Sequence, residues 1–283
     1  MDRAPKSEST AEPRKWTPDD FTMPPVISRR FRTNLECSRD EFEKKGPDLI
    51  EAIRKEGHFD QRAMKEQWDF RLEIRDKTPR PKVLMTHIPV LVRFAKSDSP
   101  KTVVEMHPQI GENHAQLLIA QDRTDESPSR FEDLEKECKE LLPRVLHHFG
   151  MKGIRGFVLE YRNLIARERY PIFWEGENTL ELGRLLRLFQ SHADFGKYVT
   201  PFSVEFNTAT PLSGPGTIRF EMSTVPQEKK DFALGVNLSY NSLAKKDPES
   251  CDVVFQELAD AHDLLFKDFV RHFSPEALST FTQ

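Results

Sequence analysis

The chain has 283 residues, enough for one large domain or two of ordinary size, and either can bury a sizeable core. Charged residues make up 31% of it, with both signs mixed along the chain and a formal net charge of -4. This composition excludes the overall basic character that favours nucleic acid or an anionic membrane surface.

The first 25 residues are rich in proline, serine, threonine and charge, and such a composition buries too little apolar surface to fold alone. We therefore expect residues 1–25 to form a disordered tail. Its two aromatic residues, Trp16 and Phe21, are candidates to anchor the tail to the body of the protein or to a binding partner.

Residues 26–150 are expected to form the first half of the fold, with the order β-α-β-β-β-β-α. Ser38 and Glu41 form a capping box that predicts the start of a helix, and Gly46-Pro47 predicts an interruption within it. Alternating apolar residues predict strands at 26–37, 68–74, 83–94, 102–107 and 114–120.

A second capping box, Ser129 with Glu132, predicts the start of the long helix that closes this half. Apolar residues then recur every three or four positions, as on the buried face of a helix. Gly150 is expected to end the helix because glycine readily adopts the left-handed conformation, and Pro143 is expected to kink it.

From Gly153 the apolar period changes to two, which predicts a strand with one buried face. Phe157, Leu159 and Tyr161 lie on that apolar face, and Asn163 falls on it as well. Buried amides are usually hydrogen-bonded to backbone, so we expect a structural role for Asn163 and for Tyr161 beside it.

Residues 151–283 are expected to form the second half, with the order β-α-β-β-β-α. After its first strand comes a loop that contains Trp174, a candidate partner-binding residue. Helices are expected at 179–189 and 250–273, and strands at 202–209, 217–222 and 232–240.

The predicted fold class is therefore α+β, with two pseudo-repeated antiparallel sheet halves that pack together as one unit. Each half has a sheet with one face to cover and a long C-terminal helix that can cover it. The order of elements resembles the duplicated saddle of the TATA-box-binding protein, and a helix-grip arrangement fits as well. The repeat is one of pattern, because the two halves share no visible sequence identity.

No catalytic or ligand-binding motif stands out, and we expect no catalytic residue, no cofactor and no metal. Cys37, Cys138 and Cys251 are far apart and form no Cys-x-x-Cys pair, which argues against a disulfide framework and a zinc knuckle. His107 and His114 lack the converging ligands of a metal site. The cysteine usage, with no spanning apolar run and no signal-peptide core, predicts a cytoplasmic protein without a membrane partner.

Two alternatives remain open. Asp69, Glu73 and Arg75 faintly resemble the acidic strand of a metal-dependent nuclease, although arginine stands where that chemistry needs lysine. Arg29, Arg30 and Arg32, with Phe31, could contact a phosphate backbone in a nucleic-acid-binding regulator. The alternation of Arg30 and Arg32 with apolar neighbours fits a solvated strand face better. A nucleic-acid partner is therefore not expected.

The run from Ser129 through Tyr161 and Asn163 resembles a sporadically distributed bacterial family in which an amphipathic helix precedes a strand ending in Tyr-x-Asn. The family's closing helix carries Leu-x-x-x-His before an aromatic residue, matched here by Leu258, His262 and Phe266. The resemblance implies a structural role for His262 and transfers no activity. It also implies an accessory protein of a CRISPR or other antiphage locus.

The leading hypothesis is thus a non-enzymatic adaptor that binds another protein in a multi-component bacterial system. The sequence predicts neither the identity of this partner nor the oligomeric state.

Overall fold

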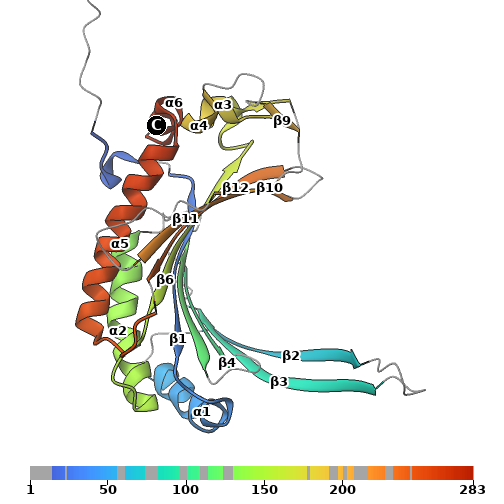
Figure 1. Cartoon of the computed structure of the whole chain (residues 1–283), viewed down its shortest axis with the longest axis vertical. Helices are drawn as coiled ribbons and strands as arrows, with labels where there is room; N and C mark the ends of the chain where they lie inside the picture. The colour runs from blue at the N-terminus through green and yellow to red at the C-terminus, as the bar shows by residue number, and fades with distance from the viewer. Residues whose placement is uncertain are drawn as a thin grey trace, which may run out of the picture.

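The computed structural model describes residues 15–22, 24–55, 61–73, 82–95, 101–108, 114–123, 130–176, 179–190, 197–199, 203–206, 216–226, 232–242 and 244–282. These contain a nine-stranded antiparallel sheet with the order β10-β11-β12-β6-β1-β5-β4-β3-β2 (Figure 1). Its strands are β1 (Val26–Leu35), β2 (Gln61–Glu73), β3 (Lys82–Ala95), β4 (Lys101–Pro108), β5 (Ala115–Asp122), β6 (Phe157–Ala166), β10 (Ser203–Phe206), β11 (Gly216–Pro226) and β12 (Phe232–Ser242).

A smaller sheet has the order β7-β8-β9, with β7 (Trp174–Glu175), β8 (Thr179–Glu181) and β9 (Lys197–Val199). The helices are η1 (Pro18–Asp20), α1 (Arg39–Lys55), α2 (Phe131–Phe149), η2 (Pro171–Phe173), α3 (Leu182–Leu185), α4 (Arg187–Gln190), α5 (Cys251–His272) and α6 (Pro275–Phe281). No helix of the described residues is both long enough and apolar enough to cross a membrane.

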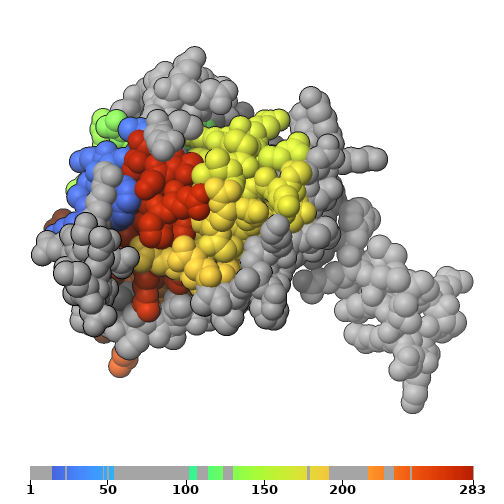
Figure 2. Space-filling view, turned by 90° about the horizontal axis from the view of Figure 1, so that it is seen from above, coloured from blue at the N-terminus to red at the C-terminus, as the bar shows by residue number. Residues whose placement is uncertain are grey.

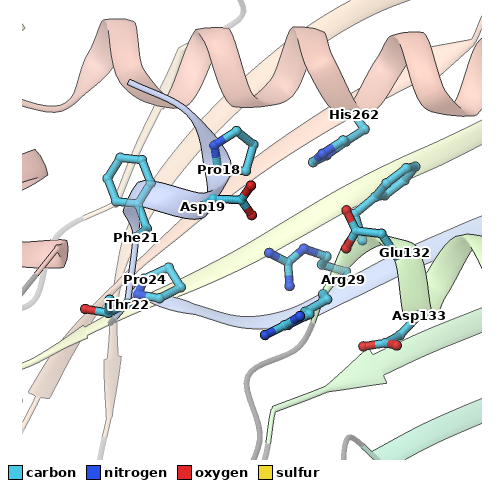
Figure 3. A pocket seen from close by; sticks show the side chains of 11 residues that line it. Pro18, Asp19, Phe21, Thr22, Pro24, Arg29, Glu132, Asp133 and His262 are labelled. Atoms are coloured by element: carbon cyan, nitrogen blue, oxygen red, sulfur yellow. The ribbon is translucent and has the colours of Figure 1, made fainter. Parts of the chain in front are cut away.

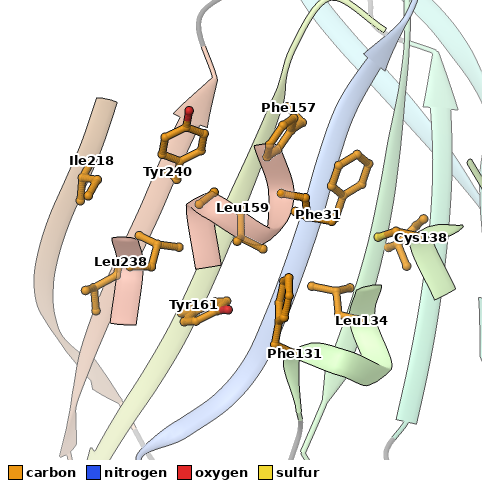
Figure 4. Close-up of a cluster of buried hydrophobic side chains, with 14 of the residues drawn as sticks. Phe31, Phe131, Leu134, Cys138, Phe157, Leu159, Tyr161, Ile218, Leu238 and Tyr240 are labelled. Carbon is orange, nitrogen blue, oxygen red and sulfur yellow. The ribbon is translucent and has the colours of Figure 1, made fainter. Parts of the chain in front are cut away.

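The two long helices, α2 and α5, lie side by side on the convex face of the large sheet (Figure 1). Strand β6 alternates buried and part-exposed residues over its whole length, so one face meets these helices. Side chains from β1, β6, β11 and β12 join those of α2 in one buried apolar cluster (Figure 4). Phe31 and Phe157 stack within it, with ring centroids 5.5 Å apart.

The α+β class with antiparallel sheets is confirmed. The middle of the large sheet is the pair β1 and β6, in which Phe31 lies opposite Leu159. Outward from β1 the order is β5, β4, β3 and β2, and outward from β6 it is β12, β11 and β10. In the first half, the first strand in sequence, β1, is central and the last strand, β5, lies next to it. In the second half, β6 and β12 are placed in the same way. An internal duplication remains a prediction.

The predicted helix at the end of the first half is present, and its C-terminal end matches the expectation. Gly150 has a positive φ of 71° at the C-terminus of α2, and its amide donates to the carbonyl oxygens of His147 and Leu146. The helix continues through Pro143. Ser129 lies outside the described residues, and Arg130 is the N-terminal cap residue without a side-chain capping bond.

Two local predictions were wrong. The first is the interruption of α1, which instead runs without a break through Gly46 and Pro47. A helical residue before proline is crowded through its Cβ, and Gly46 has none. The predicted start of α1 at Ser38 is correct, because the amide of Glu41 donates to the Ser38 hydroxyl at 3.2 Å.

The second wrong prediction is a single helix over 179–189. This segment forms β8 and two one-turn helices, α3 and α4, and the small sheet and α6 were not predicted at all. In Figure 2 the C-terminal residues (red) lie between the N-terminal segment (blue) and residues 171–176 and 179–190 (yellow). Arg184 of α3 forms an ion pair with Glu276 of α6, and the amide of Ser274 donates to the carbonyl oxygen of Leu185 at 2.8 Å. These contacts of α3 with Ser274 and α6 favour two short helices over one continuous helix.

Candidate functional site

Three side chains from distant parts of the chain meet on the helix side of the sheet. Arg29 of β1 lies opposite Tyr161 of β6 in the strand register, with its guanidinium carbon 5.2 Å from the Tyr161 ring centroid. The Tyr161 hydroxyl is 2.5 Å from Nδ1 of His262, which belongs to α5. The His262 ring stacks on Phe131, the first residue of α2, with centroids 4.0 Å apart. This cluster therefore joins both halves of the chain.

Burial controls the charges of this cluster. It lowers the pKa of Arg29 and raises the pKa of Tyr161 well above its ordinary value. Burial, together with the positive charge of Arg29, also lowers the pKa of His262 below its ordinary value of 6.5. His262 is thus held neutral near pH 7, next to a buried guanidinium.

A cavity of about 430 Å³ opens beside the cluster, between the N-terminal segment, the start of α2 and α5 (Figure 3). Arg29 and His262 line it from the body, and Asp19, Glu132 and Asp133 contribute carboxylates. A recess of about 60 Å³ shares some of these residues and adds Tyr161 and the apolar side chains Val26, Phe266 and Phe269.

Within the described structure, the Nε and Nη1 atoms of Arg29 are buried and have no hydrogen-bond partner. A buried polar group without a partner costs roughly 1–3 kcal/mol, and a charged one costs more. Such atoms can be satisfied by a water or by a ligand with acceptor oxygens. Arg29 is therefore the most conspicuous polar group of the cavity.

From the sequence, Arg29 was named only as one of three arginines that could contact a phosphate backbone, and it was not placed on the buried face. The signal was its position, because Arg29 has the same parity as the inward-facing Phe31, whereas Arg30 and Arg32 have the opposite parity. The partners of Arg29 carried no such signal, since Tyr161 and His262 are separated from each other by 101 positions.

The predicted site residues have different surroundings. Asn163 is buried on β6, and its Nδ2 donates to the carbonyl oxygen of Val236 on β12 at 2.9 Å. Phe21 packs edge-on against Phe266 and Phe269 of α5, with centroids 5.8 and 5.9 Å away. Trp16 in turn packs on Phe21, with centroids 5.5 Å apart.

These contacts anchor residues 16–21 to the body of the protein, the first of the two alternatives for this tail. Trp174 is only 8% exposed and belongs to the apolar core at β7. Its ring consequently offers little surface to a partner.

A second surface lies on the opposite face of the sheet. The part-exposed side chains there include Arg30 on β1, Glu160 and Arg162 on β6, and Arg219 and Glu221 on β11. Nε of Arg162 is 2.9 Å from Glu160, and Nη2 of Arg219 is 2.5 Å from Glu221. We call this surface, made by the outward side chains of β1, β6, β11 and β12, the open face. Next to it on β5, Ala120 is buried together with Val103 of β4.

The residues of the nuclease alternative are only partly described. The side chains of Asp69 and Glu73 on β2 lie outside the described part of the structure, as does Arg75 entirely. In the part that is described, no group of three or more His, Cys, Asp or Glu residues is arranged to hold a metal ion.

Comparisons with known proteins do not assign a family. No protein-family model matches the chain, and no curated protein matches it. Among solved structures, it is similar to the crystal structure of DynU16, whose description refers to the dynemicin biosynthetic locus. The match has 12% identity and a TM-score of 0.26, and it covers 90% of this chain and 97% of DynU16. A likeness this weak carries no argument about function.

Proposed function

We propose that this protein is a non-enzymatic adaptor that binds another protein through the open face of its large sheet. The supporting observation is how the sheet is covered. Helices α2 and α5 pack on the convex face, whereas the side chains of β6 that point the other way remain part-exposed (Figure 1). An adaptor needs such a broad, preformed surface and no catalytic group.

The charges of the open face favour a protein over a polyanion. The arginine–glutamate pairs of β6 and β11 balance positive charge locally, which weakens any general attraction for nucleic acid. Mixed charges of this kind give specificity and a rapid encounter with a partner of complementary pattern. Burial and the neighbouring Arg162 lower the pKa of Arg30, so a partner carboxylate beside Arg30 would compensate that desolvated charge.

The biological setting belongs to this proposal and rests on the family resemblance alone. It is a cytoplasmic, multi-component bacterial system of antiviral defence, such as a CRISPR locus with accessory proteins. No observation on the described residues favours the nuclease or the nucleic-acid-binding regulator over the adaptor.

The proposal is tested by purifying the tagged chain from its native bacterial host at near-physiological salt. We expect a partner protein in stoichiometric yield with the wild type. The double variant Arg30→Glu with Arg162→Glu should lose it, because both substitutions reverse charge at the centre of the open face. Lys267→Glu is the matched control, since Lys267 is exposed on α5 on the other side of the sheet.

Melting temperatures of the purified variants would establish that each remains folded. Recovery of the wild type alone would count against the adaptor, and so would retention of the partner by a folded double variant. Nucleic acid in place of a protein partner would favour the regulator.

A further inference from the structure

The cavity at Arg29 lies on the helix side of the sheet, away from the open face, and its use is independent of the proposed adaptor role. Four segments far apart in sequence line it (Figure 3). They are the N-terminal segment from Pro18 to Thr22 with Pro24, Arg29 of β1, residues 130–133 at the start of α2, and His262 of α5. Its volume of about 430 Å³ falls in the range of small-molecule sites, roughly 300–1,000 Å³.

Arg29 determines the first chemical requirement of a ligand. Among the described residues its buried Nε and Nη1 atoms have no hydrogen-bond partner, although Tyr161 lies against the guanidinium and the carboxylates of Glu132 and Asp133 act on its charge. A carboxylate pairs with one edge of a guanidinium, either through Nε and Nη2 or through Nη1 and Nη2. A ligand that carries a carboxylate would therefore supply an acceptor to one of the two unpartnered atoms.

The rim determines the second requirement. Among the described lining residues, the charged groups other than Arg29 are Arg130, Asp19, Glu132 and Asp133, so this part of the rim is negative overall. A doubly charged phosphate would be repelled there, whereas a cationic group next to the carboxylate would be attracted. The charge pattern thus matches a zwitterion.

The recess determines the third requirement. Val26, Phe266 and Phe269 give it an apolar lining, and its volume is about 60 Å³. At roughly 10–15 Å³ for each water-sized position, this space accommodates a small aliphatic group.

We infer that this cavity binds a free α-amino acid with an aliphatic side chain. The carboxylate pairs with Arg29, the ammonium group faces Asp19 and Glu132, and the side chain enters the recess beside Phe266. The N-terminal segment, held by Phe21, forms one wall of the site.

Isothermal titration calorimetry of the full chain with L-leucine tests this inference. We expect saturable binding to the wild type and binding at least about tenfold weaker in Arg29→Gln, the loss typical of a removed charge-assisted hydrogen bond. Arg32→Gln is the matched control, because Arg32 lies on the same strand but is exposed on the other face. It should bind L-leucine as the wild type does.

Three further probes separate the parts of the site. L-leucinamide lacks the carboxylate, isocaproate lacks the ammonium group, and both should bind more weakly than L-leucine. Glu132→Gln, at an exposed position, should weaken the binding of L-leucine and not that of isocaproate. This second variant keeps the test decisive if Arg29→Gln fails to fold.

The inference is overturned if L-leucine does not bind the folded wild type at millimolar concentration. It is also overturned if inorganic phosphate binds at Arg29 and L-leucine does not, or if Arg29→Gln and Arg32→Gln bind L-leucine equally.

Discussion

The most informative single contact is that between Tyr161 and His262. Both residues were expected to be structural, and each came from a different half of the chain. The contact of the Tyr161 hydroxyl with Nδ1 of His262, together with the stacking of His262 on Phe131, makes them one unit that ties β6 to α5 and α2. Burial, and next the positive charge of Arg29, lower the pKa of His262 and so favour its neutral ring.

The lowered pKa of His262 predicts a pH-dependent stability. The unfolded chain binds the proton more readily than the folded protein, so folding loses free energy as the pH falls below the ordinary histidine value of 6.5. The neighbouring acids Asp263, Glu132 and Glu135 oppose this effect without reversing it. His262→Gln should therefore be less stable than the wild type at pH 7.5, and the difference should narrow at pH 5.

Urea unfolding at both pH values measures that difference. A gap between His262→Gln and the wild type that is equal at the two pH values would contradict the neutral, buried histidine.

At the scale of elements, prediction succeeded where local signals agreed. The segment from α2 to β6 combines helical spacing, a C-terminal glycine and a strict alternation, and the structure has all three. It failed at 179–189, where leucines at 180, 182, 185 and 186 satisfy a helical pattern. There β8 pairs with β9 and α3 packs on α6, and both partners come later in the chain. Such tertiary contacts override a local pattern and leave no local trace.

The candidate cavity was beyond prediction for the same reason. Its described walls come from residues 18–22, 24, 29, 130–133 and 262, and no spacing rule connects them. The sequence showed that Arg29 has the parity of the inward-facing residues. It did not show that His262 of α5 lines the same cavity as Arg29.

The connections between elements supply a second prediction, which concerns two glycines near the start of β6. Gly150 has φ 71° and nothing within 4 Å of an added Cβ, so only its backbone conformation requires glycine. At Gly153 an added Cβ would be 1.8 Å from the carbonyl oxygen of Glu249, the residue that pairs with Ile154. There the requirement is space.

Alanine and asparagine should distinguish the two requirements. Gly150→Ala should cost about 1–2 kcal/mol and Gly150→Asn less, because asparagine tolerates the left-handed region. Gly153→Ala and Gly153→Asn should both cost about 1–3 kcal/mol, because any Cβ forces the chain before α5 to move. Thermal and urea unfolding of the four variants provide the measurement. Rescue of Gly153 by asparagine would show that the close approach to Glu249 is not the constraint.

At the scale of the whole molecule, the two halves share one sheet and one core. Strand β1 of the first half pairs with β6 of the second, and α2 packs along α5. One cluster of buried apolar residues contains Phe31 and Leu134 from the first half and Leu159 and Leu258 from the second. Separation at residue 150 would expose the edges of β1 and β6 and the facing sides of both long helices. Unpaired strand edges and large apolar surfaces favour aggregation over folding.

The full chain is therefore expected to unfold in a single cooperative transition. Fragments 1–150 and 151–283 should be unfolded or aggregated when expressed alone and should associate when expressed together. Circular dichroism, amide hydrogen exchange and size-exclusion chromatography of the fragments measure this. A full chain cut by a protease after purification is the matched control, because its halves have already folded together. Cooperative melting of either isolated fragment would show that the halves are separate domains, since each would then bury a sufficient core without β1–β6 pairing.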